Sequence, residues 1–186
     1  IWINCSFTNG PFDLTSIHMK DSLNGVGATT QADIVRTSNG GQTWVGANNF
    51  GNQHIAVSFY GAQNGVWVGY NGCIQRSTDG GATLQSIAGE YNYYHYNKIK
   101  FTDPQNGYCV GEGGKILKTT NGGQQWTFVN ASTGAELNDL SFVNTNVGYV
   151  VGNTGTIRKT TNGGTSWTNL SGIPTNTDLY SVHFIN

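Results

Sequence analysis

Three glutamates are the first residues of this sequence whose chemistry could serve catalysis. Glu90, Glu112 and Glu136 fall in three separate stretches between predicted strands. A glycosidase needs two carboxyl groups that face one cleft. Glu112 and Glu136 could approach one another at one end of the fold, but nothing in the sequence marks them as a pair. Because no Ser, Cys and His are spaced as a nucleophile with its base either, we predict no catalytic residues.

Histidines and cysteines give no stronger case for a metal. His18 and His183 occupy the same position in two copies of a repeat, where the other copies have Ser or Lys. No carboxylate or cysteine recurs beside them, so a polar inner-strand position is favoured over a metal site. Cys5, Cys73 and Cys109 are an odd number without metal-ligand spacing, so at least one is free or paired outside the chain. We predict no metal and no cofactor.

A basic residue stands just before a glycine-rich motif in each of four repeated segments. These residues are Arg36, Arg76, Lys118 and Lys159. They could form an arc that pairs with carboxylates or phosphates. The alternative is that a long side chain here lies over its neighbour on a half-exposed strand. We favour the alternative, because the position belongs to the repeat consensus.

The segment 88–98 departs most from the repeat and is the second candidate for binding. Its candidate residues are Tyr91, Tyr93, Tyr94, His95 and Tyr96. Rigid amphipathic tyrosines are common on protein-binding and sugar-binding surfaces. Alternatively, alternate tyrosines extend a strand and pack between sheets. The sequence supports both interpretations, and both place the segment on the face opposite the glycine-rich motifs.

An internal repeat positions all these residues and is the strongest signal in the sequence. Four octapeptides, called the boxes below, end 40, 42 and 41 residues apart. They occupy residues 37–44, 77–84, 119–126 and 160–167. Upstream of each lies an alternating apolar run, and then a second run such as the Gly-Tyr-Cys-Val-Gly of residues 107–111.

Each repeat therefore contains four short strands. A period of 40 to 42 residues with four strands is the size of one β-propeller blade. Helical periodicity is absent, which excludes an α-solenoid. We predict an all-β fold, a β-propeller of four-stranded antiparallel blades, with four complete box repeats and a partial blade at each end.

The box residues suit a tight turn between the third and fourth strands. Ser, Thr, Asp or Asn side chains can bond the turn backbone, and Gly adopts positive φ without a Cβ clash. The Trp packs beneath the turn. We assign a structural role to Thr37, Asn39, Gly41, Trp44, Ser77, Asp79, Gly81, Thr119, Asn121, Gly123, Trp126, Thr160, Asn162, Gly164 and Trp167.

Residues 1–186 are predicted to form a single propeller, and the repeat sets the bounds of its blades. The expected parts are an outer strand of a split blade at 1–10, blades at 11–52, 53–92, 93–134 and 135–176, and an inner strand of a further blade at 177–186. The ends are assigned by spacing, since Trp2 precedes Ile17 by the same 15 residues that separate Trp167 from Val182. Either the parent protein has further blades, or C-terminal residues lie outside this chain.

The boxes resemble the Asp-box of the BNR repeat. Their Thr-Thr-Asn-Gly-Gly-x-x-Trp form, joined to Gly-Tyr-x-Val-Gly, is similar to the photosystem II assembly/stability factor family and to related bacterial surface propellers. The resemblance covers essentially all of the chain and implies a non-enzymatic propeller that binds other proteins, including a membrane-protein complex. In the photosynthetic branch a basic patch on the propeller contacts the membrane-protein partner. This chain has few basic residues to form such a patch, which argues against that particular partner. Similar propellers include sialidases and endo-acting β-glucanases, but the three arginines of this chain do not lie where a sialidase triad would.

Composition narrows the class of partner. Charged residues make up 10% of the chain, against about 25% in an average domain, and the net charge of -1 gives no case for nucleic acid. No apolar run approaches the ~20 residues that span a bilayer. Low charge with many Asn and Thr indicates an extracytoplasmic protein. We predict a non-catalytic protein-binding or assembly propeller, with a carbohydrate-active or sugar-binding propeller as the alternative.

Overall fold

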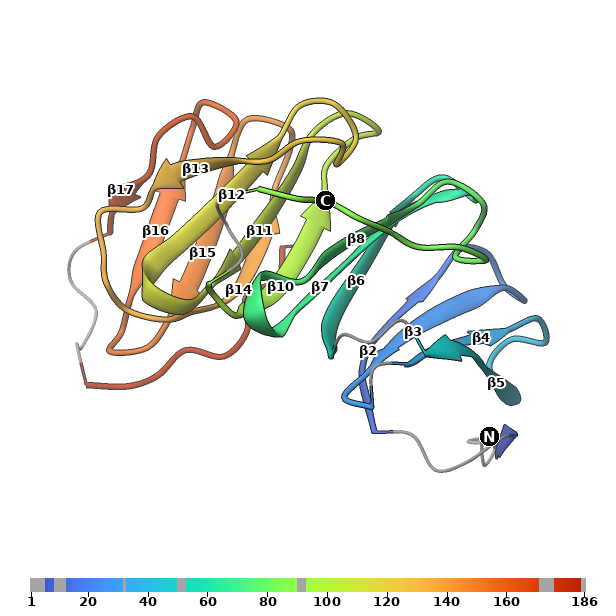
Figure 1. The fold of residues 1–186 in the computed structure, drawn as a ribbon. Helices are drawn as coiled ribbons and strands as arrows, with labels where there is room; N and C mark the ends of the chain where they lie inside the picture. The colour runs from blue at the N-terminus through green and yellow to red at the C-terminus, as the bar shows by residue number, and fades with distance from the viewer. Residues whose placement is uncertain are drawn as a thin grey trace.

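Four sheets, each built on four antiparallel strands, follow one another along the chain and stand side by side (Figure 1). The computed structural model describes residues 6–8, 13–31, 33–49, 53–89, 93–170 and 176–184. The predictions of an all-β class and of four-stranded antiparallel sheets are confirmed, and we call each sheet a blade. The described strands form no closed sheet, so the number of blades and the closure of a ring stay predictions. Within the described residues, no helix is long and apolar enough to cross a membrane.

Each blade is a simple meander in which consecutive strands pair. The strand bounds are β2 (Leu14–Met19), β3 (Gly25–Thr29), β4 (Asp33–Thr37), β5 (Thr43–Asn49); β6 (His54–Tyr60), β7 (Asn64–Gly69), β8 (Ile74–Ser77), β9 (Gln85–Ser86); β10 (Tyr96–Phe101), β11 (Gly107–Gly111), β12 (Lys115–Thr119), β13 (Thr127–Asn130); β14 (Leu137–Phe142), β15 (Gly148–Gly152), β16 (Ile157–Thr160) and β17 (Thr168–Asn169). Short 3-10 turns, η1 (Tyr70–Gly72) and η2 (Glu112–Gly114), join the second and third strands of two blades.

A glycine stands at the first or second position of the second strand in each blade, and in three blades an aromatic ring lies against it. A Cβ on Gly107 would meet the ring of Phe101 at 2.7 Å, and a Cβ on Gly148 would meet Phe142 at 2.6 Å. Gly65 has the same relation to Phe59. The six-residue spacing from Phe to Gly in the repeat thus corresponds to a close packing contact within the second, third and fourth blades.

The hydrophobic core lies between blades and not within one. The buried cluster of Val26, Ala28 and Ile34 from the first blade with Val57, Phe59 and Trp67 from the second is one example. Two further clusters join the second blade to the third and the third to the fourth in the same way. Each blade therefore needs a neighbour to bury its faces.

The N-terminal strand differs from the expected arrangement. β1 (Ser6–Thr8) pairs in parallel with β5 as a fifth strand of the first sheet, and not with a separate blade. The physical reason is that the outer edge of a seven-residue strand exposes backbone N–H and C=O groups that an extended segment can pair with. Trp2 lies outside the described residues.

The C-terminal segment 176–184 contains no assigned strand but runs along β14. The Phe184 N–H donates to Ser141 Oγ at 3.3 Å, as the Phe101 N–H donates to Ser58 Oγ at 3.2 Å. The second bond joins the first strands of two complete blades. Residues 181–184 therefore lie where the first strand of a following blade would lie, and their assignment to such a blade stays a prediction.

Candidate functional site

Each box is a self-contained turn. The hydroxyl of its first residue accepts the N–H of its second glycine at 2.8 to 3.0 Å. Its Asn or Asp accepts the N–H four residues further on at 2.9 to 3.0 Å. The first glycine N–H donates to the turn between the first and second strands of the same blade. These two turns form one end of each blade, the box face, and their polar groups serve the turns themselves.

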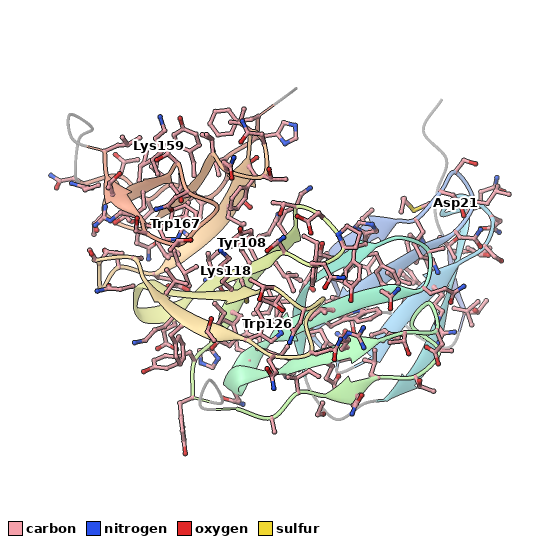
Figure 2. The ribbon with its side chains drawn as sticks, turned by 90° about the horizontal axis from the view of Figure 1, so that it is seen from above. Asp21, Tyr108, Lys118, Trp126, Lys159 and Trp167 are labelled. Carbon is pink, nitrogen blue, oxygen red and sulfur yellow. The ribbon has the colours of Figure 1, made fainter. Side chains whose placement is uncertain are left out.

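Three of the four basic residues before the boxes tie neighbouring blades together. Each donates to a box-glycine carbonyl of the next blade at 2.5 to 2.8 Å. The pairs are Arg36 with Gly81, Arg76 with Gly122, and Lys118 with Gly163. Lys118 also lies 5.8 Å above the ring of Tyr108, and the two labels stand together in Figure 2. These contacts favour the structural interpretation of the position over anion binding.

Lys159 holds the same position in the last described blade. Its Nζ lies 5.5 Å from the centre of the Tyr149 ring. No carbonyl acceptor for Lys159 is present in the described part of the chain. Among the described residues, Lys159 therefore makes the contact with a tyrosine ring that Lys118 also makes, but not the hydrogen bond to a carbonyl of a following blade.

The opposite ends of the blades form a second surface, which we call the connection face. It consists of η1, η2, the described residues of the links between blades (87–89, 93–95 and 131–136), and the equivalent contacts of Asp13 with residue 30 and of residues 177–178 with 154–155. Hydrogen bonds join these links to the preceding blade, since the Gly72 N–H donates to the Tyr94 carbonyl at 2.7 Å. The Tyr-rich segment lies on this face.

The candidate tyrosines divide into surface and core. Tyr93 is 85% exposed. Tyr96 is fully buried in the cluster between the second and third blades, and Tyr94 is partly buried against that cluster. Tyr91 lies outside the described residues. The binding interpretation thus applies to Tyr93, and the packing interpretation to Tyr96.

Tyr94 forms a compact group with two residues of the third blade. Lys115 Nζ lies 4.7 Å from the Tyr94 ring centre and 5.5 Å from that of Phe128. The two rings meet edge to face at 5.9 Å. On the connection face, the ammonium group of Lys115 therefore lies within cation–π distance of two aromatic rings.

His95 connects the Tyr-rich segment with η1 and η2. Its Nδ1 accepts the Asn71 N–H at 3.2 Å, its Nε2 lies 3.9 Å from Glu112 Oε2, and its ring packs on Tyr70 at 4.9 Å. With Nδ1 accepting, this network assigns the proton of the neutral ring to Nε2, toward Glu112. The 3.9 Å between Nε2 and the Glu112 carboxylate is longer than a hydrogen bond, so the two groups are not joined in this structure.

The Glu136 carboxylate is held by a neutral group. Glu136 Oε1 accepts Asn97 Nδ2 at 2.9 Å. In the described structure, Glu112 and Glu136 share no partner, and Glu90 lies outside it. A pair of catalytic carboxylates is therefore not evident on this face.

A cleft of about 620 Å³ opens along β10, β14 and residues 181–184. Buried Asp139 lies at its wall, 3.3 Å from Lys98 Nζ, and accepts the Ser181 hydroxyl at 2.8 Å. Lys100 and His183 also line the cleft. Because Lys98 neutralises Asp139, the arrangement ties β10, β14 and the C-terminal segment together and offers no acid–base pair.

The histidines and cysteines supply no metal site among the described residues, where no group of three His, Cys, Asp or Glu side chains gathers. Burial, with Lys100 and Lys20 nearby, lowers the pKa of His18, so its ring is neutral near pH 7. Cys73 and Cys109 are free and buried. Burial raises the pKa of Cys73 to about 12, which leaves its thiol unreactive at neutral pH.

Sequence reasoning missed Tyr70, Trp67 and Asp139. Tyr70 is 38% exposed and stands in η1, directly after the Gly that ends the second strand. Asp139 stands where the second and third blades have Ala56 and Lys98. Each of the three differs in residue type from its counterparts in the other blades, and an alignment of the repeats would have pointed to them.

The fold and the boxes define the class of this chain, a propeller-type β-repeat, and the comparisons with known proteins agree. The family described as "Photosynthesis system II assembly factor YCF48" matches residues 47–134, just under half of the chain. The matched part contains the second blade, the Tyr-rich segment and the third blade. The resemblance inferred from the boxes is thereby confirmed. Comparison with curated proteins gives no match.

Solved structures show the same fold at low identity. A structure of YCF48 bound to D1 peptide is 20% identical, with a TM-score of 0.69, over 85% of this chain and 53% of that one. An ancestral GH74 enzyme is 18% identical, with a TM-score of 0.73, over 87% and 24% of the two chains. The GH74 xyloglucanase from Xanthomonas campestris is 13% identical, with a TM-score of 0.63, over 80% and 28%. The chain thus spans about half the length of the first protein and less of the enzymes.

Proposed function

We propose that this chain is a non-catalytic protein-binding or assembly module whose contact surface is the connection face around Tyr93. The observation that carries the proposal is the match to the assembly-factor family over residues 47–134. That stretch contains the most exposed aromatic residue of the described chain, Tyr93. A family likeness and a surface feature therefore coincide in the same blades.

The chemistry of the connection face supports protein binding. Tyr93 and Tyr70 present aromatic surface on short turns, and such side chains lose little conformational entropy on binding. The backbone beneath them is held by blade-to-blade hydrogen bonds at Gly72 and Asn71. Preorganised aromatic residues are typical energetic centres of protein interfaces. The D1 peptide in the similar YCF48 structure is consistent with a peptide or protein as the ligand.

A carbohydrate-active propeller is the second candidate, because GH74 enzymes share the fold. Two features of the described residues speak against it. The Nδ1 atom of His95 accepts the Asn71 N–H, and Glu112 and Glu136 have no common partner. Hydrolysis of xyloglucan by the purified chain would favour this candidate over protein binding.

Photo-crosslinking tests the proposed surface. A photoreactive amino acid in place of Tyr93, in protein expressed in its own host, should form adducts with a defined protein partner. The same group in place of Leu23, which is 55% exposed in a turn of the box face, serves as the control and should not. Replacing Tyr70 and Tyr93 with Ser should weaken binding of the identified partner at least fivefold, since central aromatic residues contribute about 1 kcal/mol or more each. Equal labelling from both positions would contradict the proposal.

A further inference from the structure

Charged residues are sorted between the two faces of this chain, although its net charge is only -1. On the box face, the described charges are the bases Lys20, Arg36, Arg76, Lys100, Lys118 and Lys159 and the acids Asp21, Asp79 and Asp103. On the connection face, they are the acids Asp13, Glu112, Glu136 and Asp178 and the bases Lys115 and Arg158. The Arg158 guanidinium donates to the Ala131 and Ser132 carbonyls of the link 131–136, and Lys98 and Asp139 pair with one another in the cleft. The face that carries the exposed tyrosines is therefore the acidic one.

The acids of the connection face are not neutralised by the protein itself. Glu112 accepts the backbone N–H of His95 at 3.3 Å, and Glu136 accepts an Asn side chain. Asp178 accepts the Thr154 N–H at 2.9 Å, and Asp13 accepts the Gln31 side chain at 2.8 Å. Among the described residues, none of these four carboxylates pairs with a Lys or Arg. All four are exposed, so each can accept a further donor from a partner.

The bases of the box face, in contrast, are largely engaged. Arg36, Arg76 and Lys118 donate to carbonyls of the next blade, and Lys20 Nζ donates to the Gly80 carbonyl at 3.3 Å. Their side chains are thus held in contacts between blades. The carboxylates that lie beside exposed aromatic side chains and can accept a donor from a partner are on the connection face.

One ammonium group of the protein itself, that of Lys115, already packs against aromatic rings on the connection face. Lys115 is held between the rings of Tyr94 and Phe128. Tyr93, next to Tyr94 in the chain, is 85% exposed. Tyr70 packs on the ring of His95, whose Nε2 lies 3.9 Å from the Glu112 carboxylate. Aromatic faces and carboxylates together are the groups that attract ammonium and guanidinium side chains.

We propose that the connection face binds a basic, extended segment of a partner protein. Its Lys or Arg side chains would lie over Tyr93 and Tyr70 and pair with Glu112 and Glu136. The inference rests on the proposed function and names the chemistry of the partner. An acidic segment would be repelled by the same carboxylates.

Three synthetic nonapeptides test the inference by titration against the intact chain at about 50 mM salt, where surface charges are weakly screened. One alternates Lys with Ser, the second replaces Lys by Gln, and the third replaces Lys by Glu. The Lys peptide should bind at least fivefold more tightly than the Gln peptide, and the Glu peptide should bind most weakly. Amide chemical shifts should change in η1, η2 and residues 93–95.

Charge-matched variants locate the effect. Glu112→Gln with Glu136→Gln should weaken binding of the Lys peptide at least about threefold, as expected for two exposed ion pairs. Asp21→Asn with Asp79→Asn makes the same change in net charge on the box face. Other blades carry Asn144 and Asn39 at these positions, so the control should fold and bind within about twofold of the parent.

Two results would overturn the inference. Equal binding of the Lys and Gln peptides, or equal effects of the two double variants, would show that the acids of the connection face do not select the partner. The proposed function would survive that result if a protein partner still cross-linked at Tyr93. Shifts confined to the box face, with no adduct at Tyr93, would overturn both.

Discussion

Asp79 is the box residue that differs in charge from its counterparts Asn39, Asn121 and Asn162. Its Oδ2 accepts the Thr83 hydroxyl at 2.6 Å and its Oδ1 accepts the Thr83 N–H at 2.9 Å. These bonds, the side-chain one first, lower the pKa of Asp79 to about 2. Because the other three boxes make the backbone bond with Asn, the charge adds to a turn that a neutral amide can also form.

The charge at Asp79 predicts a pH-dependent contribution to stability. A carboxyl whose folded pKa is about 2, below its ordinary 3.8, stabilises the fold fully above the ordinary value and loses that effect as the pH falls through about 2. Asp79→Asn should therefore be less stable than the parent at pH 6, and the two should converge near pH 2. Urea unfolding across this range measures the difference. A difference that does not change with pH would contradict the assignment.

At the scale of the element, the second blade departs from the repeat by moving a tryptophan between strands. Its box ends in Leu84, where the other boxes end in Trp. Trp67 on β7 is fully buried and meets Phe59 edge to face at 5.2 Å, as Trp126 meets Phe101 at 6.1 Å. A Cβ on Gly81 of the box would touch the Trp67 ring at 3.0 Å. Trp67 therefore fills from the second strand the space that the box Trp fills elsewhere.

This exchange predicts strong coupling between residues 67 and 84. Trp67→Val alone should cost about 3 to 5 kcal/mol, the usual range for truncating a buried tryptophan, and Leu84→Trp alone should cost about 1 to 3 kcal/mol by overpacking. The double variant should be at least about 1 kcal/mol more stable than the sum of the single effects. Chemical denaturation of the four proteins closes the cycle. Additive costs would mean that the two rings do not share one space.

Much of the fold could be predicted from the sequence because the repeat encodes local geometry. The box turns and the Phe-to-Gly contact each depend on residues less than ten positions apart, so the four copies of the box and the three copies of the Phe-to-Gly spacing make them visible. The fifth strand β1 depends on an edge pairing with β5 more than thirty residues away, and no residue type marks it. The repeat places Trp67 in the second strand of its blade, but its position under the box depends on packing against Gly81, which the sequence does not show.

The candidate site was less predictable because exposure is a property of packing. Tyr93, Tyr94 and Tyr96 look alike in the sequence, yet they are exposed, partly buried and fully buried in turn. The basic residues before the boxes could be listed as candidates, but their acceptors are carbonyls about 45 residues later in the chain. Backbone acceptors carry no sequence signature.

At the scale of the whole molecule, each blade is stabilised by the one before it. Val57, Ile99 and Leu140 hold the same inner-strand position in the second, third and fourth blades and are 6%, 2% and 3% exposed. Ile17 holds that position in the first described blade and is 55% exposed. Burial at this position therefore comes from the neighbouring blade and not from the blade itself, as expected for a repeat with nearest-neighbour packing.

The blade-to-blade ties give the last prediction, in which Lys118 and Lys159 serve as a matched pair. Lys118→Met removes a 2.7 Å hydrogen bond to the Gly163 carbonyl, which Tyr108 also contacts through its hydroxyl. Because that carbonyl keeps one donor, the cost should be about 1 kcal/mol in the free energy of unfolding. Lys159→Met makes the same chemical change over an equivalent tyrosine ring, but no carbonyl of the described residues accepts from Lys159. It should change the stability of the isolated chain by less than about 0.5 kcal/mol. Equal costs would show that Lys159 already has an acceptor in solution, and a blade in contact with the last one would be the structure that supplies it.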